Sequence, residues 1–98
     1  MDRKIYYIDI DGTIAQTNNG DYENARPIPK NIAKINKLYK ARHTIVYWTA
    51  RGTNSGKNWY RLTEKQLIKW GAKYTWLEMG KPSFDYIVDD RAIKISEL

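Results

Sequence analysis

Apolar residues along this chain fall into short blocks separated by polar, turn-forming stretches. Residues 4–10 are almost continuously apolar, which is typical of a strand in a parallel sheet covered on both faces. Residues 30–41 instead place Ile32, Ile35 and Leu38 on one side and lysines on the other, the pattern of an amphipathic helix. This change of period predicts that a strand is followed by a helix.

The same alternation continues towards the end of the chain. Residues 44–48 are β-branched or aromatic, which favours a second strand, and residues 58–70 repeat apolar positions as a second helix would. Short apolar stretches at 74–77 and 86–88 predict a third and a fourth strand. Strands that alternate with helices predict an α/β fold, with a parallel, Rossmann-like sheet between helices in a three-layer α/β/α arrangement.

The segment between the first strand and the first helix, residues 12–28, is polar and irregular. Asn19-Gly20 is a strong hairpin signal, so we expect a small flap over the end of the first strand. Pro27 and Pro29 favour the start of a helix immediately afterwards.

Length and composition indicate one globular domain. At 98 residues the chain can form a single core over residues 1–98, and its 42% hydrophobic content argues against disorder. The absence of cysteine excludes disulfides and cysteine-zinc sites, and no apolar run approaches the roughly 20 residues that a membrane span needs. The first residues lead into a strand and do not resemble a signal peptide, so we expect a cytoplasmic protein.

Two acidic residues at the end of the first strand are the clearest chemical feature. Asp9 and Asp11 are two positions apart, so their side chains start on the same side of the strand, and Gly12 allows a sharp turn after them. Two carboxylates this close repel each other unless one is protonated or a cation lies between them. Mg²⁺ prefers oxygen ligands of this kind, so the pair indicates a magnesium site.

Polar residues also flank the other predicted strands. Thr49 comes directly after the second strand, Lys81 precedes the fourth, and Asp89-Asp90 follow it. Each has a plain alternative, as strand-end polarity, a surface lysine or a turn. Because ligands bind at the carboxyl ends of the strands in parallel α/β folds, however, we expect these residues to meet the acidic pair of the first strand in one site.

The charge balance points to an anionic partner. The formal net charge is +6, and once the four aspartates of the expected site are set aside, 7 acidic residues remain against 17 basic ones. The rest of the surface would therefore attract phosphorylated metabolites, polysaccharide precursors or nucleic acid. Solubility alone explains the excess equally well.

Together these stretches resemble the motifs of the haloacid dehalogenase (HAD) superfamily of phosphotransferases. Its first motif, Asp-x-Asp-Gly-Thr, is matched by residues 9–13, and its second, a Thr or Ser after an apolar strand, by Thr49. Its third motif, a lysine, is matched by Lys81, and its fourth, an acidic pair after a strand, by Asp89 and Asp90. The resemblance covers nearly the whole chain and implies a minimal HAD core.

The resemblance implies a catalytic role for four side chains. Asp9 would attack phosphorus to form an aspartyl-phosphate. Asp11 would serve as general acid towards the leaving oxygen and then as general base for water. Thr49 would hydrogen-bond a phosphoryl oxygen, and Lys81 would offset its negative charge.

The resemblance also implies the surroundings of the metal and the phosphate. Mg²⁺ would be bound by the Asp9 carboxylate, the Asp11 carbonyl and Asp89, with Asp90 as a further or alternative ligand. Apart from the resemblance, Arg51 lies two residues past Thr49 on the loop at the same site, where it either binds a second anionic group of the substrate or forms a salt bridge with the acidic residues. The residues expected around the phosphate are Gly12, Thr13, Ala50 and Arg51.

Many HAD phosphatases carry a cap domain, for which neither gap between the motifs of this chain has room. We therefore expect an open site and, as in many uncapped relatives, a dimer or tetramer. The expected substrate is a small phosphorylated metabolite such as a sugar phosphate, and a nucleotide or nucleic-acid 3′-phosphatase is the second choice. A non-enzymatic phospho-receiver module also groups acidic residues, Thr and Lys around Mg²⁺, but carries its acidic pair early in the chain.

Overall fold

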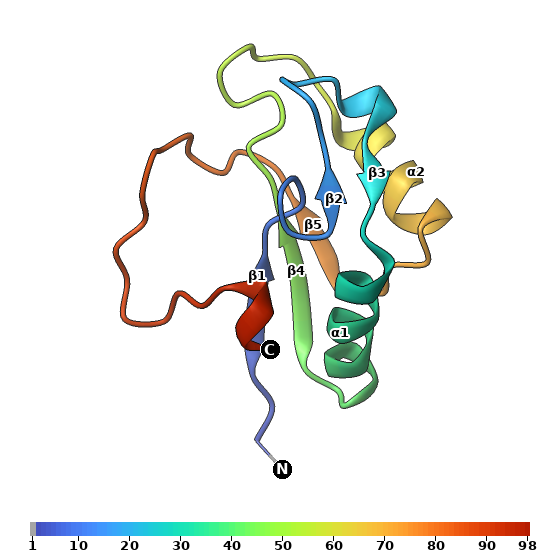
Figure 1. Cartoon of the computed structure of the whole chain (residues 1–98), viewed down its shortest axis with the longest axis vertical. Coiled ribbons are helices and arrows are strands. Elements are labelled where there is room, and N and C mark those ends of the chain that lie inside the picture. Colours follow the sequence, from blue (N-terminus) through green and yellow to red (C-terminus); the bar gives the residue numbers. More distant parts are fainter. Residues whose placement is uncertain (1) are drawn as a thin grey trace.

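The structure is a computed structural model that describes residues 2–98 (Figure 1). Its centre is a parallel sheet of three strands in the order β1-β4-β5, which span Ile5–Ile8, Thr44–Trp48 and Trp76–Glu78. Tyr7 of β1 lies opposite Val46 of β4, and Val46 lies opposite Trp76 of β5. The predicted α/β class with a parallel sheet is confirmed.

Two α-helices make the crossovers between these strands. They are α1 and α2, which span Pro29–Lys40 and Tyr60–Lys69, close to the predicted ranges. Proline stands at the first position of α1, where its fixed φ suits the helix and its missing N–H costs nothing. Gly71 follows α2 with a φ of +71°, and this left-handed residue lets the N–H of Ala72 donate to the carbonyl of Leu67.

Both helices cover the same face of the sheet (Figure 1). One buried cluster contains Ile35 of α1, Leu67 of α2 and Tyr47 of β4. The opposite face carries no α-helix in residues 2–98, and Ile5 and Tyr7 of β1 are 66% and 52% exposed there. The described part of the chain therefore has two layers, where the sequence predicted three.

The expected flap is present as a second, antiparallel pair of strands. These are β2 and β3, which span Ala15–Gln16 and Arg26–Pro27, and the short 3-10 helix η1, Tyr22–Asn24, lies between them. Asn19 and Gly20 both have positive φ, 46° and 78°, at the turn that the sequence predicted. The flap grows directly out of the turn that ends β1, where Gly12 adopts a φ of +88°.

Residues 79–94 form a long loop between β5 and a last 3-10 helix, η2, which spans Ile95–Glu97 (Figure 1, orange to red). The strand predicted at 86–88 is not formed, and Tyr86 and Val88 are 89% and 98% exposed. That prediction is wrong for this structure because an apolar pattern gives a segment the propensity for a strand, whereas a strand also needs a neighbour to bond with.

Candidate functional site

The end of β1 holds an ion pair between residues that are far apart in the sequence. The ammonium Nζ of Lys81 lies 3.4 Å from Oδ1 of Asp9. The backbone of Lys81 is fixed at the same time, because its N–H donates to the carbonyl of Thr49 (3.0 Å) and its carbonyl accepts from the hydroxyl of Thr53 (2.7 Å). The sequence expectation that the first, second and third motifs meet at this edge of the sheet agrees with these contacts.

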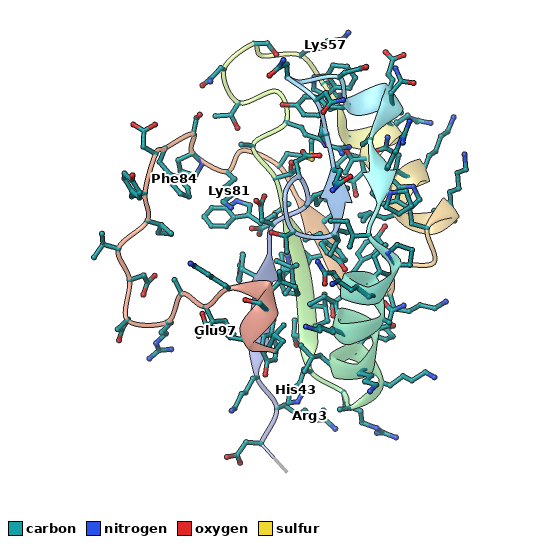
Figure 2. The ribbon with its side chains drawn as sticks, in the orientation of Figure 1. Arg3, His43, Lys57, Lys81, Phe84 and Glu97 are labelled. Atoms are coloured by element: carbon teal, nitrogen blue, oxygen red, sulfur yellow. The ribbon has the colours of Figure 1, made fainter. Side chains whose placement is uncertain are left out.

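Two aromatic rings hold the ammonium group of Lys81 beside Asp9. Its Nζ lies 5.7 Å from the ring centre of Trp48 and 5.4 Å from that of Phe84, within the range of a cation–π interaction. Figure 2 shows Lys81 and Phe84 near the start of the loop that follows β5. The lysine is therefore placed by β4 on one side and by this loop on the other.

Burial dominates the electrostatics of Asp9. Desolvation raises the pKa of Asp9 above its ordinary value of 3.8, and the neighbouring charge of Asp11 raises it further. The charge of Lys81 and the hydrogen bond from the N–H of Ile10 act in the opposite direction without cancelling this effect. Positive charge in addition to that of Lys81 would therefore stabilise the ionised form of Asp9.

Asp11 is bound on two sides by the guanidinium group of Arg51. Nε donates to Oδ2 (2.9 Å) and Nη2 donates to Oδ1 (2.8 Å), while the hydroxyl of Thr17 also donates to Oδ1. The side chain of Arg51 is 0% exposed, and that of Asp11 is 25% exposed. Of the two roles considered for Arg51, the structure therefore contains the salt bridge to the acidic residues, and the guanidinium is not free to bind a second anion.

The residues expected to cradle a phosphate are arranged differently from the prediction. The N–H of Gly12 donates to the carbonyl of Ala15 (2.7 Å) and that of Thr13 to the carbonyl of Ile10 (3.1 Å). Both groups are therefore occupied inside the turn that ends β1, whereas Ala50 and Arg51 line the cavity at this end of the sheet. The tightness of this turn, which Gly12 permits, is the physical reason.

Thr49 is almost fully buried, with 1% of its surface exposed. Its Oγ1 accepts a hydrogen bond from the N–H of Arg51 (3.1 Å), and its carbonyl accepts from the N–H of Lys81. In this structure Thr49 therefore fixes the backbone of the two basic residues that reach the aspartates.

The acidic pair Asp89-Asp90 lies apart from this group. Both residues are exposed on the long loop, and the N–H of Arg91 donates to Oδ1 of Asp89 (2.9 Å), which lowers the pKa of that carboxyl. Within residues 2–98 no three Asp, Glu or His side chains come together as a metal site. The predicted meeting of all four aspartates is therefore not present, because the fourth strand that would carry the last two is not formed.

Two hollows adjoin Asp9. A cavity of about 350 Å³ is bounded by the aspartates, Lys81 and the flap. A groove of about 1130 Å³ runs between β1 and the long loop, and its walls include Tyr7, Ile87, Asp9 and Asp89. Asp9 thus borders both the cavity beside the flap and the groove that Asp89 also lines.

Sequence reasoning missed the residues that surround the Arg51 guanidinium from the helix side. Its Nη1 donates to Oγ1 of Thr63 (3.1 Å) and to Oε1 of Gln66 (2.6 Å), two buried polar residues of α2. A Thr and a Gln three positions apart, next to the apolar Leu67 on the inner side of a predicted helix, were the signal for a buried polar partner.

Comparison with known proteins shows the fold and leaves the family open. No family model matches the chain, and no curated protein does. A crystal structure of an MCSG target from Vibrio cholerae is similar, with a TM-score of 0.87 and 28% identity over 96% of this chain and 85% of that one. The α/β arrangement is therefore shared with a natural protein over nearly the whole chain. No helix in residues 2–98 is long and apolar enough to cross a membrane.

Proposed function

We propose that this protein is a Mg²⁺-dependent phosphomonoester hydrolase of the HAD superfamily that acts through an aspartyl-phosphate on Asp9. The observation that carries the proposal is the 3.4 Å pair of Asp9 with Lys81 beside Asp11 at the carboxyl end of β1. Lys81 lies 70 positions or more from both aspartates along the chain. A reaction at phosphorus needs this combination of a nucleophile, a proton carrier and a cation.

The proposed reaction has two displacements at phosphorus. In the first, an oxygen of Asp9 forms a bond to phosphorus while the bond to the leaving oxygen breaks, and Asp11 gives that oxygen its proton. In the second, a water molecule attacks the phosphorus of the aspartyl-phosphate, Asp11 takes the proton of the water, and Asp9 leaves as a carboxylate with release of phosphate. Lys81 stabilises the negative charge on the phosphoryl oxygens in both displacements.

The oxygen donors of Asp9 and Asp11 would suit a magnesium ion, and Asp89 would complete the set once the long loop brings it to Asp9. Asp9 is a hard oxygen donor whose pKa is raised by burial in spite of Lys81, so a further cation is favourable beside it. The residues that would hold the ion are Asp9, the carbonyl of Asp11 and Asp89, with Asp90 next to them. When bound, the ion would neutralise charge between Asp9 and the phosphoryl group.

We propose further that the sheet of the complete HAD core forms when residues 86–88 pair with the outer edge of β1. In residues 2–98 β1 bonds to β4 alone, and the side chains of Ile5 and Tyr7 are exposed, as are those of Tyr86 and Val88. An apolar strand edge and an apolar segment that face each other across one groove are complementary. A loop as long as residues 79–94 is uncommon in a compact domain, where lengths beyond about 12–15 residues usually either serve function or are disordered or linker segments.

Hydrogen exchange tests this closure. With Mg²⁺ and inorganic phosphate added, amides of 86–88 and of β1 should become protected together, and Asp89→Asn should reduce the protection while Asp85→Asn, an exposed change in the same loop, should not. Protection confined to residues 9–13 would contradict the pairing.

The cavity favours a small phosphorylated metabolite such as a sugar phosphate over nucleic acid. Its volume of about 350 Å³ lies at the lower end of the range of about 300–1,000 Å³ for small-molecule sites. Arg51, which could otherwise bind a second anionic group of a larger substrate, is fully buried against Asp11.

A phosphate-release assay tests the function. The wild-type protein should release phosphate from a panel of sugar phosphates in the presence of Mg²⁺, and a chelator should stop the reaction. Asp9→Asn should abolish turnover, whereas Asp85→Asn should leave it unchanged. Activity that persists in Asp9→Asn, or in metal-free buffer, would contradict the mechanism, and faster release from a 3′-phosphorylated oligonucleotide would favour the alternative substrate.

A further inference from the structure

The buried guanidinium of Arg51 is an unusually complete hydrogen-bond centre. An arginine side chain has five N–H donors and no acceptor, and the four contacts of Arg51 go to both oxygens of Asp11 and to two side chains of α2. A charge with 0% exposure is costly unless it is paired and hydrogen-bonded, and Asp11 is the carboxylate that pairs with it. The orientation of Asp11 is therefore linked to groups that lie well behind the cavity.

The helix side of this centre is held by buried hydrogen bonds. Thr63 and Gln66 are both buried and lie about one turn apart on α2, so they present their oxygens to the same Nη1. Gln66 is itself held, because its Nε2 donates to the carbonyl of Tyr22 (2.6 Å). The ring of Tyr22 also lies 4.8 Å from Cζ of Arg51. Helix α2 and the flap thus clamp the guanidinium from two directions.

The clamp leaves the two oxygens of Asp11 unequal. Oδ1 accepts from Nη2 of Arg51 and from the hydroxyl of Thr17, whereas Oδ2 accepts only from Nε of Arg51. A carboxylate offers about four lone-pair sites, two on each oxygen. Oδ1 is therefore saturated, and Oδ2 retains the free site at which a proton can be exchanged with a substrate.

We propose, on the basis of the proposed function, that Arg51 is a positioning residue that fixes Asp11 so that Oδ2 alone exchanges the proton with the leaving oxygen. Arg51 does not touch the substrate in this role. A lysine cannot replace it, because a single ammonium group cannot bond both carboxylate oxygens side by side while also reaching Thr63 and Gln66.

A leaving-group series separates this role from a purely structural one. A proton carrier matters for an alkyl phosphate, whose leaving oxygen is basic, and not for 2,4-dinitrophenyl phosphate, whose leaving group departs without a proton. With Arg51→Lys, kcat/KM for the alkyl ester should fall by about 100-fold or more, the lower part of the range for general acid catalysis. For the dinitrophenyl ester it should fall by less than about threefold, because kcat/KM reports the steps up to departure of the leaving group.

Two further variants make the result decisive. Arg61→Lys changes an exposed arginine of α2 in the same way and should leave both substrates unaffected. Gln66→Met keeps both charges and removes one contact of Nη1, so it should give a smaller loss of the same selectivity, and it serves if Arg51→Lys does not fold.

The outcomes distinguish the two proposals. Selective loss with the alkyl ester supports the positioning role of Arg51. An equal loss with both esters, or no loss with either, in a folded variant would overturn it and leave the proposed function standing. A wild-type protein that releases phosphate from neither ester would overturn the proposed function itself.

Discussion

Replacement of Lys81 by methionine tests the central ion pair most directly. The change keeps an unbranched side chain of similar length and removes the positive charge that lies 3.4 Å from Oδ1 of Asp9. Two unit charges at this distance interact by about 5 kcal/mol at an effective dielectric constant near 20, and by about 1 kcal/mol in water. Lys81 is 15% exposed and Asp9 38% exposed, so the true value lies between these limits.

The expected loss falls mainly on the reaction. If about 2–4 kcal/mol of this interaction stabilises the transition state, kcat/KM should decrease by roughly 30- to 1,000-fold. The folded protein should change far less, by about 0–1 kcal/mol, because Asp9 is more than a third exposed and solvent screens the pair. The variant should therefore be nearly as stable as the wild type and much slower.

The pH profile adds a second, independent measurement. The charge of Lys81 lowers the pKa of Asp9, so its removal raises that pKa further. In the proposed mechanism Asp9 must be ionised to attack phosphorus, and the acidic limb of kcat/KM should consequently move to higher pH in Lys81→Met. Lys81→Arg keeps the charge and should hold the limb near its wild-type position.

Lys57→Met is the matched control for the loss of one positive charge. Lys57 also lies over an aromatic ring, at 4.3 Å from the centre of Trp59, and Figure 2 shows it at the top of the view, away from Lys81. The reasoning would be refuted by a Lys81→Met protein within threefold of the wild type with an unshifted acidic limb, or by an equal loss in Lys57→Met.

Two further predictions concern stability. Burial raises the pKa of Asp9 above 3.8, its ordinary value. The stability that Asp9 contributes is therefore present below pH 3.8 and is lost as the pH rises through the pKa that Asp9 has in the folded protein. In the presence of chelator, Asp9→Asn should raise Tm, and by more at pH 7 than at pH 4. A gain that is equal at both pH values would show that the buried charge is not the cause. The buried hydroxyl of Tyr47 has no hydrogen-bond partner among the described residues, so Tyr47→Phe should be neutral or stabilise the fold by up to about 1 kcal/mol in urea unfolding. A clear destabilisation would instead mean that a buried water satisfies this hydroxyl.

The strands and helices that cross the centre of the domain could be predicted from the sequence. The second strand was predicted at 44–48 and is observed at Thr44–Trp48, because its β-branched and aromatic residues fit a buried strand in any parallel sheet. The ends of the first and second helices were predicted to within two residues. Apolar residues that recur with a period of 3.6 over three turns fit a helix and do not fit a strand. Asp9 and Lys81 meet because each follows the carboxyl end of a parallel strand, β1 and β5 respectively, and these ends share one edge of the sheet.

Contacts that depend on the approach of two elements could not be predicted in the same way. Whether Arg51 would turn towards a substrate or towards Asp11 depends on where α2 places Thr63 and Gln66, and no local pattern contains that distance. The prediction of a strand at 86–88 was wrong for a related reason. Its residues have a high propensity for strand structure, but a strand also needs a hydrogen-bonding partner, which the edge of β1 would have to supply. Hydrophobic periodicity specifies which side of a helix or strand is buried, but it does not specify which other element covers that side.

The two aspartates that follow β1 therefore differ in how firmly they are held. Asp11 belongs to a buried set of hydrogen bonds that includes Arg51, α2 and the flap, and its position does not depend on the long loop. Asp9 borders the groove and depends on residues of the long loop. Lys81 already forms an ion pair with Asp9, whereas Asp89 lies exposed across the groove. If closure of the loop precedes tight binding of Mg²⁺, the apparent affinity for the ion is the intrinsic affinity reduced by the fraction of molecules that are closed. A change that favours closure should then strengthen Mg²⁺ binding without touching any ligand, whereas a change at Arg51 should alter proton transfer and leave the affinity for the ion as it was.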